Sequence, residues 1–134
     1  MTPHRVRFAT ARVATLATVD GSGAPHAVPV AFAVDGDTVW SAVDAKPKRR
    51  TALRRLDNIR AEPRVSLLAQ HWDEDWSALW WVRVDGLAVV TDEPSAVDRA
   101  VALLKAKYEQ YRTVDVHGPV IQVAVHAWRG WSAA

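Results

Sequence analysis

The first third of the chain alternates apolar and polar positions in the manner of β-strands. Residues 12–19 are rich in β-branched and apolar side chains and end at a glycine-containing turn at 20–23. In residues 24–34 the larger apolar side chains occupy every second position and smaller residues lie between them. This pattern predicts a strand with one bulky face and one small face. Because proline lacks an N–H, Pro29 predicts that this strand lies at a sheet edge or is bulged there.

The rest of the chain predicts further strands and two helices. The sequence Asp35-Gly36-Asp37 is typical of a hairpin turn. Further strands are predicted over residues 38–43, 64–69, 79–91 and 120–125. A short helix is expected to begin near Thr51, a plausible N-cap, and to end before Pro63, and an amphipathic helix is expected over 93–112.

The long stretch 79–91, rich in strand-forming residues, contains Asp85-Gly86, which is compatible with either a hairpin turn or a bulge. A bulge in one long bent strand is favoured, because a turn would leave two short arms. Alternation along this strand puts two sets of residues on opposite faces: Trp81, Arg83 and Asp85 on one, and Trp80, Val82 and Val84 on the other.

The order of predicted elements is therefore β-β-β-α-β-β-α-β. Successive hairpins indicate an antiparallel sheet, and six strands in a chain of 134 residues commonly curl into a barrel that hides their edges. We expect a small α+β barrel with six strands and two helices, built as one domain over residues 1–134.

Composition excludes several classes of protein. The chain is 49% hydrophobic and 24% charged, which is typical of a globular domain, and it has no cysteine for a disulfide, a thiolate metal site or a cysteine nucleophile. Neither a membrane-spanning apolar run nor a signal-peptide core is visible, so a cytoplasmic location is expected. No nucleophile elbow, glycine-rich phosphate loop or metal motif is present, and residues 71–76 are expected to be a polar loop rather than a metal site.

Charge is concentrated in one segment. The net charge is +2, but residues 46–60 carry seven Lys or Arg against one Asp, a local +6, which leaves −4 for the rest of the chain. This segment predicts binding of an anion such as a phosphate, with donors from Lys46, Lys48, Arg49, Arg54 and Arg55. Thr51 and the N-terminus of the helix would add further donors. A solvated helix face and a nucleic-acid backbone are the alternatives, the second disfavoured by the acidic remainder of the chain.

Four of the seven tryptophans fall within residues 72–81. Such a cluster is typical of a core or a subunit interface, and it equally fits the wall of a pocket for a planar ring. Both interpretations hold together if a ring lies at a subunit interface.

As a set, these segments resemble the split β-barrel flavin and deazaflavin oxidoreductases. They are similar in particular to the PPOX-class group that depends on the deazaflavin coenzyme F-420, relatives of pyridoxamine phosphate oxidase. The similarity covers roughly residues 5–131 and rests on segments 15–21, 25–32, 35–37, 46–49, 53–60, 63–68, 73–77 and 79–86.

The resemblance implies a homodimer of six-stranded split barrels with two cofactor sites at the subunit interface. It implies that Lys46, Lys48, Arg49, Arg54 and Arg55 hold the phosphate end of the cofactor, with Arg55 as the best match to a basic residue of the family's helix. The cofactor ring is expected to lie against the backbone of the second strand, at Val28, Pro29 and Val30. Trp76 matches a tryptophan that approaches the cofactor from the other subunit. One departure is Leu53, which falls near the position of a family serine that Thr51 would replace.

The function implied is hydride transfer between coenzyme F-420 and a small conjugated organic substrate. FMN is the alternative cofactor, and a non-catalytic flavin or heme carrier is a second class of function in the same fold. A polyanion-binding module is the third hypothesis. Hydride chemistry resides in the cofactor ring, so the protein supplies placement and at most one proton donor, for which His26, Arg83 and Tyr111 are candidates.

Overall fold

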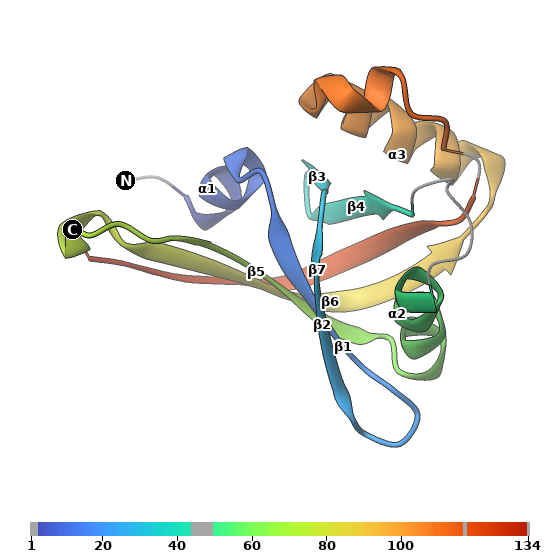
Figure 1. The fold of residues 1–134 in the computed structure, drawn as a ribbon, viewed down its shortest axis with the longest axis horizontal. Coiled ribbons are helices and arrows are strands. Elements are labelled where there is room, and N and C mark those ends of the chain that lie inside the picture. The colour runs from blue at the N-terminus through green and yellow to red at the C-terminus, as the bar shows by residue number, and fades with distance from the viewer. Residues whose placement is uncertain (1–2, 44–49, 117, 134) are drawn as a thin grey trace.

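The computed structural model describes residues 3–43, 50–116 and 118–133. For residues 50–53 it describes the backbone only. Within these residues, three α-helices and seven strands are present (Figure 1). The helices are α1 (His4–Thr10), α2 (Arg50–Ala61) and α3 (Pro94–Lys107), and two short 3-10 helices are η1 (Trp76–Ala78) and η2 (Glu109–Arg112). The strands are β1 (Ala14–Val19), β2 (Pro25–Val30), β3 (Ala33–Asp35), β4 (Thr38–Ala42), β5 (Arg64–His71), β6 (Trp80–Thr91) and β7 (Val120–Ser132).

The strands form one antiparallel sheet in the order β2-β1-β5-β6-β7-β4-β3. The two edge strands, β2 and β3, are consecutive in the chain and are joined by Ala31 and Phe32. The chain therefore passes directly from one edge of the curled sheet to the other, which brings the sheet round into the expected antiparallel α+β barrel. Pro29 lies in the edge strand β2, as its missing N–H predicts.

The predicted numbers of strands and helices are wrong: the described residues form seven strands instead of six, and three α-helices instead of two. The predicted strand 24–34 is divided at Ala31 and Phe32, because side chains bind the backbone there. The Phe32 N–H donates to Tyr108 Oη at 3.2 Å, and Ser41 Oγ donates to the Ala31 carbonyl at 2.8 Å. The unpredicted helix α1 has seven residues, no side-chain cap and only Phe8 buried, so it leaves no periodic pattern in the sequence.

Other boundaries shift by a few residues. The predicted helix 93–112 ends at Lys107, because Tyr108 adopts an extended backbone before η2 begins. The final strand continues past residue 125 to Ser132, along the whole length of β6. The prediction of one long strand through Asp85-Gly86 is confirmed, and the register of β6 against β7 shifts between these two residues. The extra residue of the bulge lies on β7, at His126, and not on β6 as predicted.

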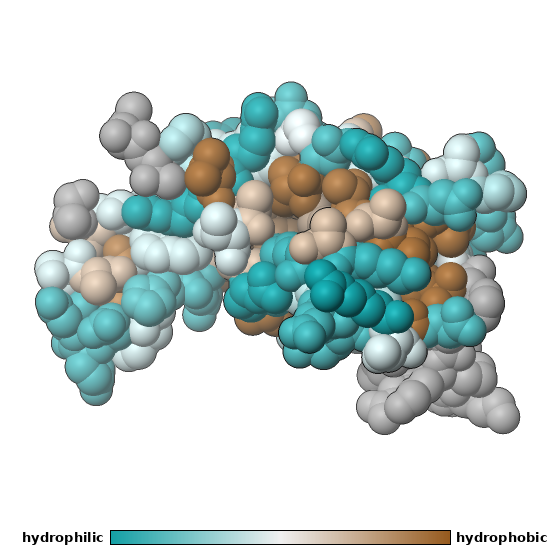
Figure 2. Space-filling view, turned by 90° about the horizontal axis from the view of Figure 1, so that it is seen from above, coloured by the Kyte–Doolittle hydropathy of each residue, from teal (hydrophilic) through white to brown (hydrophobic). Residues whose placement is uncertain are grey.

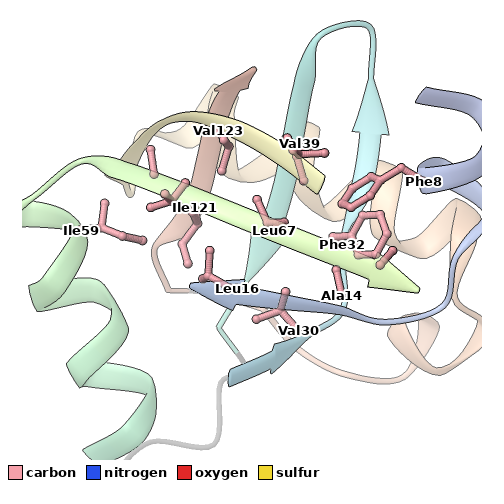
Figure 3. Close-up of a cluster of buried hydrophobic side chains, with 14 of the residues drawn as sticks. Phe8, Ala14, Leu16, Val30, Phe32, Val39, Ile59, Leu67, Ile121 and Val123 are labelled. Atoms are coloured by element: carbon pink, nitrogen blue, oxygen red, sulfur yellow. The ribbon is translucent and has the colours of Figure 1, made fainter. Parts of the chain in front are cut away.

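The barrel interior is filled by apolar side chains from every strand and from α1 and α2 (Figure 3). Phe8 of α1 packs against Phe32 with ring centroids 4.6 Å apart, which covers one end of the barrel. A second buried cluster joins α3 to β4 and contains Trp40, Leu104 and Tyr108. Apolar patches also reach the surface among polar side chains (Figure 2); the large apolar residues most exposed in the described chain are Val6, Val13, Trp72, Trp76, Leu87, Val89 and Trp131.

Candidate functional site

Helix α2 is held in one orientation by its buried face. Leu56 and Ile59 enter the barrel core, and the buried Asn58 side chain donates to Thr18 Oγ1 at 3.0 Å. This fixed rotation decides which arginines meet solvent. Arg54 is exposed, whereas the neighbouring Arg55 is half-buried.

Arg55 has a buried polar atom that is not satisfied within the described residues. Its Nε atom is buried and has no hydrogen-bond partner in the described chain. Desolvation lowers the pKa of the guanidinium, while Tyr111 lies close enough to act in the opposite direction. Burying an N–H donor without an acceptor is costly, and an anion that accepted a hydrogen bond from Nε would offset that cost. Arg55 therefore has the character of an anion-binding residue.

The proposed ring-binding strand, β2, has one free edge. Val30 is buried, Val28 is half-buried and Pro29 is exposed, so the strand presents both backbone and small apolar surface at this edge of the sheet. A planar ring could lie against such a surface without displacing a large side chain.

Part of the predicted phosphate site lies outside the described residues: Lys46, Lys48 and Arg49. Thr51 falls within α2, which begins at Arg50, so the prediction that Thr51 caps the helix is wrong. Its backbone N–H still belongs to the first helical turn, where N–H groups lack intrahelical partners.

Trp76 lies at the opposite end of the chain's fold from α2. It begins η1 in the turn between β5 and β6, where it is 66% exposed and meets Trp72 edge to face at 6.0 Å. Figure 1 shows this turn and the C-terminus at one end of the long axis and α2 at the other. Strand β5 begins shortly after the end of α2 and has eight residues. Its length therefore separates α2 from the turn that holds Trp76 by about 25 Å. One chain therefore does not bring Trp76 to Arg54 and Arg55.

The acidic run beside Trp76 is a hydrogen-bonded turn. The Asp73 carboxylate accepts the Asp75 N–H at 2.7 Å, and Asp75 accepts both the N–H and the hydroxyl of Ser77. The two bonds from Ser77 lower the pKa of Asp75 below its usual value. The expected polar loop is present, although it is shorter than predicted because β5 extends to His71. Within the described ranges no three His, Asp or Glu side chains are grouped to hold a metal ion.

The same end of the fold carries an aromatic hollow of about 530 Å³. We call this the tryptophan hollow; its lining residues are Leu68, Gln70, His71, Trp72, Leu79, Trp80, Trp81, Arg83 and Trp131. Strand register sets two rows across the outer face of the sheet, Leu68-Arg83-Arg129 and Gln70-Trp81-Trp131. The sequence pattern found the face of Trp81 and Arg83 but missed its continuation on β7, because the pairing of distant strands is not encoded in local periodicity.

A polar cluster borders the tryptophan hollow on β5, β6 and β7. Arg83 Nε donates to Asp85 at 3.0 Å, Ser66 Oγ donates to the same carboxylate at 2.7 Å, and Arg129 Nε lies 3.5 Å from it. Burial raises the pKa of Asp85, but the hydrogen bonds from Ser66 and Arg83 outweigh it and lower the pKa below the usual value. With Asp85 ionised, two arginines face one carboxylate, and the cluster has a net charge of +1.

The three candidate proton donors lie in different surroundings. His26 is on β2, and its Nδ1 atom is buried without a partner in the described chain. Tyr111 is on η2, close to Arg55, whereas Arg83 is engaged by Asp85. His26 lies on β2, the strand predicted to support the cofactor ring. Tyr111 lies beside Arg55, which is predicted to bind the cofactor phosphate.

Comparison with known proteins assigns the family. Residues 1–132 match the family model described as pyridoxamine 5'-phosphate oxidase, so the chain belongs to this family of split-barrel proteins. No curated protein matches the sequence significantly.

Solved structures share the fold at low sequence identity. A conserved hypothetical protein from Mycobacterium tuberculosis is 23% identical, with a TM-score of 0.77 over 99% of this chain and 86% of that one. An FAD-binding protein from Mesorhizobium loti is 19% identical, with a TM-score of 0.65 over 92% of this chain and 85% of that one. The heme storage protein HutZ from Vibrio cholerae is 14% identical, with a TM-score of 0.68 over 96% and 92%. Proteins with this fold thus include ones that hold a flavin and ones that hold heme.

In the part of the chain that the structure describes, no helix combines the length and apolar character needed to cross a membrane.

Proposed function

We propose that this protein is an oxidoreductase that binds the deazaflavin coenzyme F-420 and transfers a hydride between it and a small conjugated organic substrate. The observation that carries the proposal is the half-buried Arg55, whose Nε has no partner in the described chain. It lies in a segment with a local charge of +6. Such a cation fits the phosphate and carboxylate groups of the coenzyme.

The roles of the chain's residues follow from this assignment. Arg54 and Arg55, with Lys46, Lys48, Arg49 and the first turn of α2 at Thr51, would hold the phosphate end. The free edge of β2 at Val28, Pro29 and Val30 would support the ring, and His26 or Tyr111 would supply a proton to the substrate. The bound coenzyme supplies the hydride itself.

The proposal also includes the assembly. A single domain over residues 1–134 would form a homodimer, in which Trp76 of one subunit approaches the cofactor held by α2 of the other. Because Trp76 and α2 lie about 25 Å apart along β5 in one chain, a shared site requires two chains. A cytoplasmic location is part of the same proposal.

Two alternatives use the same fold. FMN would occupy the same cationic site and would favour an oxidase, since reduced FMN reacts with oxygen. A non-catalytic heme carrier is favoured by a different observation: His71 lines the tryptophan hollow with its side chain 48% exposed, and imidazole is a common heme ligand. Binding of polyanions through segment 46–60 is a weaker fourth interpretation.

The test is a binding titration of the protein with F-420, FMN and hemin, followed by tryptophan fluorescence and, for hemin, by the Soret band. We expect F-420 to bind in the micromolar range, and Arg55→Gln to weaken it about tenfold or more, the value of a charge-assisted hydrogen bond. Arg60→Gln is the matched control, since Arg60 is on the same helix but exposed and paired with Asp57 at 3.5 Å.

Each other result identifies an alternative. Tighter binding of FMN than of F-420 would move the protein to the FMN branch. A hemin complex that is lost in His71→Ala, without binding of either flavin, would replace the oxidoreductase proposal by a carrier function. Equal affinity of Arg55→Gln and Arg60→Gln for F-420 would remove Arg55 from the phosphate site.

A further inference from the structure

Lys107, the last residue of α3, carries a half-buried amine at the junction of β2 and β3. Its Nζ donates to the Phe32 carbonyl at 3.0 Å and lies 3.6 Å from the centre of the Phe32 ring. Within the described residues no carboxylate forms an ion pair with this amine. Lys107 therefore differs from an ordinary surface lysine, and it is not among the residues proposed for the cofactor.

A second cation, Arg12, lies beside this amine just before β1. The Arg12 guanidinium is 4.6 Å from the centre of the Tyr108 ring, and the Lys107 Nζ is 5.1 Å from the same centre. Arg12 Nη2 also donates to the Lys107 carbonyl at 3.1 Å, which holds the two residues together. Arg12 is exposed, and no carboxylate of the described chain forms an ion pair with it. The two cations thus approach one ring without an acid between them.

These surroundings favour the neutral, nucleophilic form of the amine. Burial, with a smaller contribution from Arg12, lowers the pKa of Lys107 to about 8, and burial raises the pKa of Tyr108, which stays uncharged. At neutral pH about 10% of such amines are neutral, against about 0.03% of ordinary lysines. A lysine that is desolvated or lies next to another cation is the usual nucleophile toward carbonyl compounds, because only the neutral amine attacks.

We propose that the Lys107 amine forms a Schiff base with a small aldehyde that carries a carboxylate, and that Arg12 binds this carboxylate. The amine nitrogen attacks the carbonyl carbon, a C=N bond replaces the C=O bond, and the oxygen leaves as water. The protonated product keeps one N–H for the Phe32 carbonyl and a positive charge over the Phe32 ring, so both contacts of the free amine persist. The carboxylate supplies the acid that the two cations lack.

The experiment traps the Schiff base with cyanoborohydride on the full chain at neutral pH, with glyoxylate and its neutral amide, glyoxylamide, as probes. Reduction converts the adduct to a stable secondary amine, which tandem mass spectrometry locates. Glyoxylate should label Lys107 at least about tenfold faster than Lys105, an exposed lysine of the same helix. It should also label Lys107 about tenfold faster than glyoxylamide does, the difference expected for a charge-assisted contact.

Three variants separate the nucleophile from the carboxylate contact. Arg12→Gln should remove most of the preference for glyoxylate over glyoxylamide, whereas Arg12→Lys, which keeps a cation there, should retain part of it. Arg112→Gln removes an exposed arginine of η2 and is the matched control, with the preference unchanged. In every variant the labelling of exposed Lys105 is the internal reference, since its rate should stay constant.

Several results would overturn the proposal. If any other lysine of the chain is labelled as fast as Lys107, the amine has no special reactivity. Equal rates for glyoxylate and glyoxylamide in the wild-type protein, or an unchanged preference in Arg12→Gln, would show that Arg12 does not bind the carboxylate. A labelling rate at Lys107 that rises linearly with glyoxylate concentration, without saturation, would mean that no binding step precedes the reaction.

Discussion

At the scale of single residues, Lys107 shows how a charge is tolerated inside the fold. Its Nζ donates to the Phe32 carbonyl at 3.0 Å and lies 3.6 Å from the centre of the Phe32 ring. Burial, with a smaller contribution from Arg12, lowers the pKa of Lys107 to about 8. In the unfolded chain the amine keeps its ordinary pKa near 10.5. The folded state therefore loses this proton first as the pH rises.

This difference predicts a pH-dependent stability. Between pH 8 and about 9.5 the unfolded chain binds more protons at Lys107, so the free energy of unfolding should rise with pH. Lys107→Met should flatten that rise, as measured by urea unfolding at several pH values. The window stops below about pH 10 because the raised pKa of buried Tyr108 acts in the opposite direction above it. The same slope in wild type and Lys107→Met would show that another group is responsible.

At the scale of elements, the pairing of β6 with β7 depends on one close approach. Asp85 pairs with Ala127 and Gly86 with Val125, so His126 is the extra residue of a bulge on β7. A Cβ atom on Gly86 would lie 2.5 Å from the Ala124 carbonyl oxygen and 2.8 Å from a Val123 methyl carbon. Only glycine fits here without movement of the backbone.

Gly86→Ala should therefore destabilise the protein by about 1–3 kcal/mol, the usual cost of overpacking. Gly118→Ala is the control, because nothing lies within 4 Å of a Cβ at that position. The measurement is the free energy of unfolding in urea for both variants. A loss confined to Gly118→Ala, or no loss in either, would contradict the steric argument.

The accuracy with which the sequence predicted the position of each helix and strand differed between elements. Strands with clear alternation, such as β1 and β6, were predicted within two residues, and α2 within one. Helix α1 was missed, because a seven-residue helix with one buried side chain has no detectable period. The end of α3 was placed too late, because the apolar residues Tyr108 and Tyr111 continue its pattern although Tyr108 leaves the helix to bind another segment.

At the scale of the whole molecule, Tyr108 joins three segments that are distant in sequence. Its hydroxyl accepts the Phe32 N–H at 3.2 Å and donates to the Arg12 carbonyl at 3.0 Å. These bonds connect the end of α3 with the junction of β2 and β3 and with the start of β1. They occupy the backbone at the place where the curled sheet passes from one edge to the other.

Tyr108→Phe should destabilise the fold by about 1–3 kcal/mol, because it leaves the buried Phe32 N–H without an acceptor. Thr113→Ala, which removes an exposed hydroxyl bonded to the Gln110 carbonyl, should change stability little. Hydrogen exchange at Phe32 is the sharper measurement, since its amide should lose protection in Tyr108→Phe alone. Retained protection would mean that this bond does not hold the junction.

By itself, the sequence determined the antiparallel α+β class, the family resemblance and the concentration of positive charge around α2. These properties are local: alternation, turn residues and charge are read over a few consecutive positions. The residues proposed for the cofactor were also chosen locally, and they stay a proposal.

Only the tertiary structure decided which distant residues meet. It left the buried Arg55 Nε atom without a hydrogen-bond partner in the described chain, placed Trp76 at the far end from α2, and aligned Arg83 with Arg129 and Trp81 with Trp131 across β6 and β7. The physical reason is that strand register and helix rotation are set by the packing of the whole core. A shift of one residue in register would turn the side chains of Trp81 and Arg83 to the other face of the sheet.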